Sequence, residues 1–272
     1  MTDRKVYNAV ILKKMMITIK PVTGKELKTL FNRPQFRRIM FQAAEETRKQ
    51  GYEVGFNVAR GVDGKIFIGK RQYGNDFAQK PREGVSSYFA DEDLHRRMDS
   101  AGYDYIESHA SPFITFHMHQ PTGEIVSRGD LESMVRLRNC TETTKYGLQY
   151  TNQPLSLVGM WQPSNRLEVL VLQQKQERPM TETGAEILAG VLEEAFRQEY
   201  ACVENGKENS ITAAFFNARH ELRAALLYYT VNRDNKQLLI DEDELKKLEQ
   251  FAYAPRLISD KSGKPLDKKK RR

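Results

Sequence analysis

Strand-like and helix-like segments alternate along the first 178 residues, and this order constrains the fold more than any other feature of the chain. The strand-like segments are 6–20, 52–72, 112–120 and 155–174, and the helix-like segments are 24–50 and 90–110. The helix-like segment 24–50 is interrupted near Pro34 and ends at Gly51, a typical helix stop. The alternation predicts an α/β (α+β) fold in which helices flank a mixed β-sheet.

Two of the strand-like segments contain turn signals and predict paired strands. Residues 52–72 contain Asp63 followed by Gly64, which predicts two short strands around a turn. Residues 155–174 alternate around Pro163-Ser164-Asn165, which predicts a hairpin with Leu167, Val169 and Val171 on one face.

The pattern changes after Pro179, where three helical stretches are predicted. One of them is amphipathic and includes residues 213–229, and the last begins with the capping pair Asp241 and Glu244. We therefore divide the chain into a domain of mixed strands and helices at 1–178, a helical C-terminal region at 179–253 and a basic, disordered tail at 254–272. The helices could form a packed subdomain, a dimer interface or a docking site for a protein partner.

Charge and composition indicate an intracellular, cytoplasmic protein with no membrane span. No apolar run approaches the roughly 20 residues that a span requires, and the N-terminus lacks the apolar core of a signal peptide. The net charge is +7, but the last five residues are all Lys or Arg, so the remainder carries about +2. Cys140 and Cys202 have no ligand-like spacing and suggest no disulfide framework.

The predicted strand at 112–120 ends with two histidines at positions 117 and 119. Residues i and i+2 of a strand project to the same face, so both imidazoles can point toward one metal ion. Asp130, eleven residues beyond His119, can supply a third ligand if the intervening loop returns to the end of the strand. A catalytic zinc commonly has three protein ligands and one open position.

Each half of this pattern also has an ordinary explanation. Two histidines at a strand end can be a solvated or hydrogen-bonded pair, and Ser127 with Asp130 resembles a helix cap. The combined pattern of HxH, seven residues and SxxD is expected by chance in only about 2 of 10,000 chains of this composition. The combination therefore favours a metal site.

The pattern H-x-H-x(7)-S-x-x-D resembles the signature of the JAMM metalloproteases, the catalytic MPN-domain enzymes, and PTGEIVSRGDL is also similar to RadC-type relatives. The resemblance implies a cytidine-deaminase-like MPN/JAMM core over about residues 5–175. It implies one Zn²⁺ per chain held by His117, His119 and Asp130, with a ubiquitin-like or small-protein substrate cleaved at an amide bond. Gln120 departs from the pattern, since the family has proline there.

The same resemblance implies the remaining roles. Glu53, in the context GYEVGFNVARG, corresponds to the family's general base, which accepts a proton from the zinc-activated water, and Ser127 would hydrogen-bond the oxyanion. Glu45 and Glu46 are nearby alternatives to Glu53, although they fall within the predicted helix.

A non-enzymatic function is the main alternative. A scaffold or RadC-like nucleic-acid-associated protein could keep the fold and make its contacts through the C-terminal helices and the basic tail. Trp161, the only tryptophan, is expected in the core of the sheet, and His109 is a candidate either for a residue that contacts a ligand side chain or for an ordinary surface histidine.

Overall fold

The structure is a computed structural model, and the statements below concern the residues that it describes. These are 22–60, 65–73, 94, 96–98, 113–119, 130, 141–143, 149–151, 154–162, 166–174, 183, 187, 222–253 and 256–259. Among these residues, no helix combines the length and the apolar character needed to cross a membrane.

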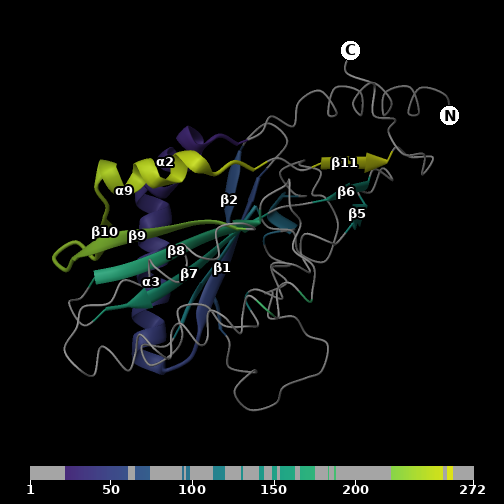
Figure 1. Cartoon of the computed structure of the whole chain (residues 1–272). Helices are drawn as coiled ribbons and strands as arrows, with labels where there is room; N and C mark the ends of the chain where they lie inside the picture. Colours follow the sequence, from purple (N-terminus) through teal and green to yellow (C-terminus); the bar gives the residue numbers. More distant parts are fainter. Residues whose placement is uncertain are drawn as a thin grey trace.

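A mixed sheet flanked by helices forms the centre of the molecule (Figure 1). The helices that the structure describes from end to end are α2 (Gly24–Phe31), α3 (Pro34–Gln50), α9 (Glu242–Lys246) and the 3-10 turn η2 (Lys247–Gln250). The strands of this sheet are β1 (Val54–Arg60), β2 (Ile66–Ile68), β3 (Gln72–Tyr73), β4 (Ile114–Met118), β7 (Leu155–Trp161), β8 (Arg166–Gln174), β9 (Leu222–Asn232) and β10 (Gln237–Leu239). The predicted α/β class with a mixed, helix-flanked sheet is confirmed.

The strand order is β10-β9-β8-β7-β4-β1-β2, with β3 also paired to β1. Among the described strands of this sheet, β4 and β7 form the one parallel pair, and the other pairs are antiparallel. A second sheet joins β11 (Arg256–Ser259), β6 (Gln149–Thr151) and β5 (Thr141–Thr143).

Helix α3 covers one face of the main sheet. It begins at Pro34, where the ring fixes a helical φ, and it ends at Gly51, which adopts a left-handed φ of 74°. The buried side of α3 packs on apolar strand residues, and Phe36 meets Phe56 of β1 at a centroid distance of 5.8 Å. Both helix boundaries confirm the sequence prediction.

Beside β1, helical residues also cover the opposite face of the sheet. Ala59 alternates with the α3-facing Val58, and it packs with the helical residues Leu94 and Met98. The sheet therefore has one face toward α3 and a second face, which carries the histidines described below.

The hairpin of β7 and β8 is confirmed, with Leu167, Val169 and Val171 all buried. The predicted helix at 213–229 is wrong over the described residues 222–229, which belong to strand β9. Apolar residues in this segment fit both a helical and an alternating period, and pairing with β8 over nine residue pairs selects the strand. The main sheet thus continues beyond the boundary placed near residue 178.

The predicted capping box of Asp241 and Glu244 at α9 is also wrong, because the capping hydrogen bond is not formed. Asp241 is the N-cap of α9, but its side chain makes no capping hydrogen bond. Glu244 instead accepts a hydrogen bond from the backbone N–H of Tyr228 at 2.8 Å and pairs with Lys247 at 2.7 Å. This carboxylate ties α9 to β9.

Candidate metal centre

Strand β4 positions both histidines. Its β-branched and aromatic residues favour an extended backbone, and it lies between β1 and β7. Phe116 and Met118 are buried in the core that includes α3. His117 and His119 alternate with them and therefore project from the opposite face of the sheet.

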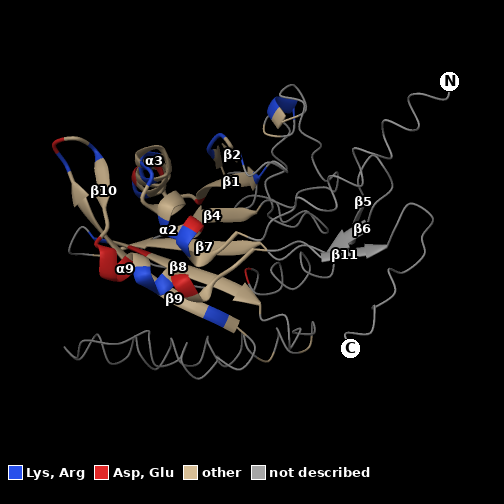
Figure 2. Cartoon of the chain, turned by 90° about the horizontal axis from the view of Figure 1, so that it is seen from above, with Lys and Arg blue, Asp and Glu red and all other residues tan. Residues whose placement is uncertain are grey.

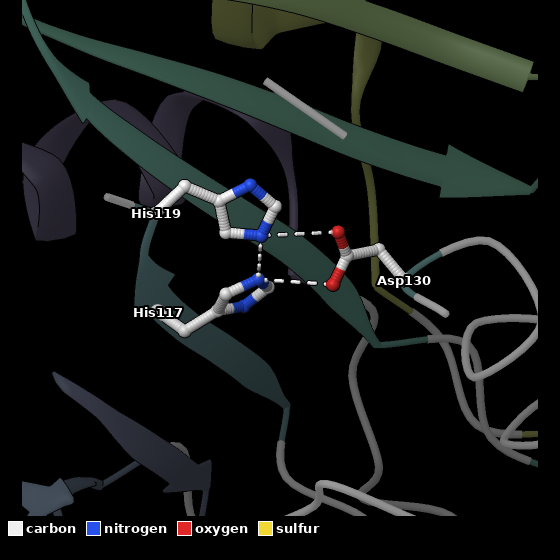
Figure 3. A group of neighbouring side chains, drawn as sticks. All are labelled: His117, His119 and Asp130. Atoms are coloured by element: carbon white, nitrogen blue, oxygen red, sulfur yellow. Dashed lines mark hydrogen bonds and ion pairs between the residues drawn. The ribbon is translucent and has the colours of Figure 1, made fainter. Parts of the chain in front are cut away.

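Asp130 completes a group of three side chains whose ligand atoms all lie within 4.8 Å of one another (Figure 3). The Nε2 atom of His117 is 3.0 Å from Oδ1 of Asp130, and the Nε2 atom of His119 is 3.2 Å from Oδ2. The two Nε2 atoms are 3.0 Å apart. The predicted return of Asp130 to the end of the histidine strand is confirmed.

Hydrogen bonds alone do not account for all three short contacts. If both Nε2 atoms carry a proton and donate to Asp130, no acceptor is left between the two nitrogens, which are 3.0 Å apart. If one histidine donates to the other, the accepting Nε2 carries no proton and cannot donate to the carboxylate oxygen beside it. A cation among the three atoms would satisfy all of them at once, because each can offer a lone pair.

The spacing also suits zinc. Ligand bonds of about 2.0–2.1 Å in a tetrahedron place neighbouring ligand atoms about 3.3 Å apart. The observed distances of 3.0, 3.0 and 3.2 Å lie within a few tenths of an ångström of this value. Two imidazoles and one carboxylate therefore fit a zinc ion in both chemistry and spacing.

The electrostatics keep the carboxylate ionised. Burial raises the pKa of the Asp130 carboxyl, but the charges of His117 and His119 and their hydrogen bonds outweigh burial and hold this pKa well below its usual range. Asp130 is thus in the form that a metal ion requires.

Glu53, the base that the resemblance implies, lies beside His119. It follows the end of α3, where Thr47 accepts a hydrogen bond from the backbone N–H of Val54 at 3.1 Å. Gly55 pairs with His117, so Glu53, two residues earlier, projects from the same face. Its Oε1 atom is 3.8 Å from Nε2 of His119, and 47% of the side chain is exposed. A carboxylate at this distance is placed to act beside a metal and remains open to solvent.

The alternative bases lie elsewhere. Glu45 pairs with Arg48 at 2.6 Å, and Glu46 pairs with Arg71 at 2.6 Å. Both residues belong to α3, which covers the face opposite the histidines. Among these three glutamates, only Glu53 lies within ion-pair distance of a histidine in the described part of the chain.

Several predicted residues lie outside the described part of the chain. These are Ser127, His109, Cys140 and Cys202. Trp161 is buried, as expected, and its indole N–H donates a hydrogen bond to the carbonyl of Ala44 at 2.8 Å.

The sequence did not reveal how the histidine strand is held against β7. Gly159 lies opposite Met118 in the parallel pair, and a Cβ atom built on Gly159 would be 2.4 Å from the sulfur of Met118. Because Gly159 has no side chain, Met118 of β4 can pack closely against β7. An isolated glycine within a strand pattern is the sequence feature that could have indicated this contact.

Comparisons with family models, with curated proteins and with solved structures found no match. A function must therefore be argued from the residues of the site and their geometry.

Proposed function

We propose that this protein is a zinc-dependent hydrolase of the JAMM type that cleaves an amide bond, with a ubiquitin-like or small-protein conjugate as substrate. The proposal includes a cytidine-deaminase-like arrangement of the sheet. The observation that carries it is the convergence of His117, His119 and Asp130, with Glu53 at 3.8 Å from His119. These four residues are the ones that the sequence motif predicted.

Each residue has a defined task in this mechanism. His117, His119 and Asp130 would hold the ion, which when bound supplies Lewis acidity for the scissile carbonyl and for water. Glu53 would accept the proton of the attacking water and deliver it to the leaving amine as the C–N bond breaks. Ser127 would donate a hydrogen bond to the developing oxyanion.

The exposure of Glu53 supports its role. A general base must reach water and substrate, and the half-exposed side chain of Glu53 does so. The ligands are less accessible, since the side chain of His119 is 7% exposed and that of Asp130 is 12% exposed. This gradient of exposure is consistent with a site that substrate approaches from the side of Glu53.

The test compares Glu53→Gln with the matched variant Glu45→Gln. Each removes one carboxylate and keeps its shape, and only Glu53 lies at the candidate site. Zinc-loaded wild-type protein is assayed on a panel of isopeptide-linked ubiquitin-like conjugates and on linear peptide amides. We expect Glu53→Gln to keep its zinc and to lose about 100-fold to 10,000-fold of the rate, while Glu45→Gln retains the wild-type rate.

Two results would oppose the proposal. Full activity in Glu53→Gln would remove Glu53 as the base. Absence of amide cleavage by the zinc-loaded wild type across the whole panel would overturn the hydrolase function itself.

A further inference from the structure

We infer that the surface along α3 binds single-stranded nucleic acid, independently of the candidate metal centre. Two pockets of about 470 Å³ and 390 Å³ flank this helix and meet at Gln42 and Arg71. The first pocket reaches Trp161 and the turn between β9 and β10, and the second lies against β2 and β3. In Figure 2, α3 lies between the β9–β10 turn and β2, and Lys and Arg colour all three parts.

We call the lining cations of the two pockets the basic surface. They are Arg38, Arg48, Lys49, Lys70, Arg71, Arg233 and Lys236. Glu45 and Glu46 are the only carboxylates among the described residues of these linings, so these residues carry a net charge of +5. The whole chain carries +7, the basic surface with these two carboxylates carries +5 and the last five residues carry +5, so all other residues together carry −3. Positive charge is therefore concentrated at this surface and in the tail.

The carboxylates do not neutralise the surface. Glu45 pairs with Arg48, and Glu46 pairs with Arg71, each at 2.6 Å. These pairs hold two guanidinium groups in place along the helix, and the seven cations of the surface outnumber its two carboxylates. An arginine guanidinium can contact a phosphate group with two N–H donors.

The arrangement is extended, which favours a chain of negative charges over a compact anion. Arg38 and Lys49 are eleven residues apart on α3 and therefore lie about 16 Å apart along the helix axis. A single phosphate would need one cluster of donors. A polyanion can follow the two connected pockets and contact cations along their length.

An exposed aromatic ring favours nucleic acid over an acidic peptide. Tyr73 lines the second pocket and is 46% exposed. Its ring meets the edge of Tyr52 at 6.0 Å, and its hydroxyl donates to Glu46 at 3.2 Å, so the ring is held in one orientation. Aromatic rings beside cations are the platforms on which the bases of single strands stack.

This surface and the metal centre lie on opposite faces of the sheet. Phe116 and Met118 are buried in the core with α3, whereas His117 and His119 project from the other face. Nucleic-acid binding should therefore survive the loss of the metal ligands, and this separates the inference from the proposed hydrolase function.

The test measures fluorescence anisotropy of a labelled oligo-dT of about 12 nucleotides with the full chain. Lys49→Glu with Lys236→Glu reverses two charges of the basic surface. Lys25→Glu with Lys246→Glu makes the same charge change on exposed residues that do not line the pockets. All variants keep the basic tail, and circular dichroism confirms that each is folded.

We expect the first double variant to weaken binding at least tenfold and to lower the slope of log K against log salt by about 1.4, since two phosphate contacts are lost. The control double variant should change binding less than threefold. Tyr73→Ala should weaken oligo-dT binding at least fivefold through lost stacking. His117→Ala with His119→Ala should bind as the wild type does.

Equal weakening by the two double variants would overturn the inference, because binding would then follow the total charge or the tail. Two results together would show that the ligand is an acidic peptide and not a nucleic acid. Tyr73→Ala would bind oligo-dT as tightly as the wild type does, and poly-glutamate would bind the basic surface as tightly as oligo-dT does.

Discussion

Replacing Gly159 by alanine would place a methyl group against the strand that carries both histidines. The new Cβ atom would be 2.4 Å from the sulfur of Met118 and 3.1 and 3.2 Å from two ring atoms of Phe116. Carbon atoms pack at about 3.5–4.0 Å, so these contacts are too short by several tenths of an ångström to more than 1 Å. Met118 is fully buried, so its side chain can move only by displacing other core atoms.

The expected magnitude follows from two opposing effects. Overpacking of a buried site costs about 1–3 kcal/mol of the free energy of unfolding. Alanine also restricts the unfolded chain, which returns about 0.4–1 kcal/mol. We expect Gly159→Ala to lower the free energy of unfolding by about 0.5–2 kcal/mol.

The assay is urea denaturation followed by the fluorescence of Trp161, the only tryptophan and a buried one. A second background, Met118→Ala, removes the sulfur that the new methyl group would meet. In that background Gly159→Ala should be neutral or stabilising, so the two changes should couple by at least about 1 kcal/mol. If Gly159→Ala stabilises the wild type, or if the coupling is absent, the packing of β4 on β7 is not as described.

Further predictions concern the end of α3 and the buried carboxylate of β8. Gly51→Ala should lower the free energy of unfolding by about 1 kcal/mol in thermal or urea denaturation, because the φ of 74° disfavours a side chain even though the space around it is open. Burial raises the pKa of Glu168, and its ion pair with Arg166 opposes this only in part. The folded protein then binds this proton more tightly than the unfolded chain does, so the contribution of Glu168 to stability decreases as the pH rises above the ordinary range of a glutamate through the raised pKa. Glu168→Gln should remove that part of the pH dependence of the urea midpoint, and an unchanged profile would refute it.

The features that the sequence predicted correctly depend on local rules. Helix α3 begins at Pro34 because the proline ring holds φ at a helical value. It ends at Gly51 because glycine, which has no side chain, readily adopts a left-handed φ. The two histidines share a face because a strand has a period of two. Asp130 was found because the motif fixes its spacing to the histidines.

The features that the sequence did not predict depend on contacts between distant residues. Strand β9 has an apolar pattern that also fits a helix, and only its pairing with β8 decides the outcome. The basic surface was missed for the same reason. Its cations come from α3, from the segment before β3 and from the β9–β10 turn, and none of these forms a charged run in the sequence. The five basic residues at 268–272 form such a run and drew attention to the tail instead.

Metal content tests the central claim most directly. Wild-type protein and the variant His117→Ala with His119→Ala are purified under zinc-replete conditions, checked for folding by circular dichroism and analysed for bound elements. We predict about one zinc per chain in the wild type and none in the variant, because two of three ligands are lost. A wild-type protein that carries no metal and takes up none on titration would contradict the account.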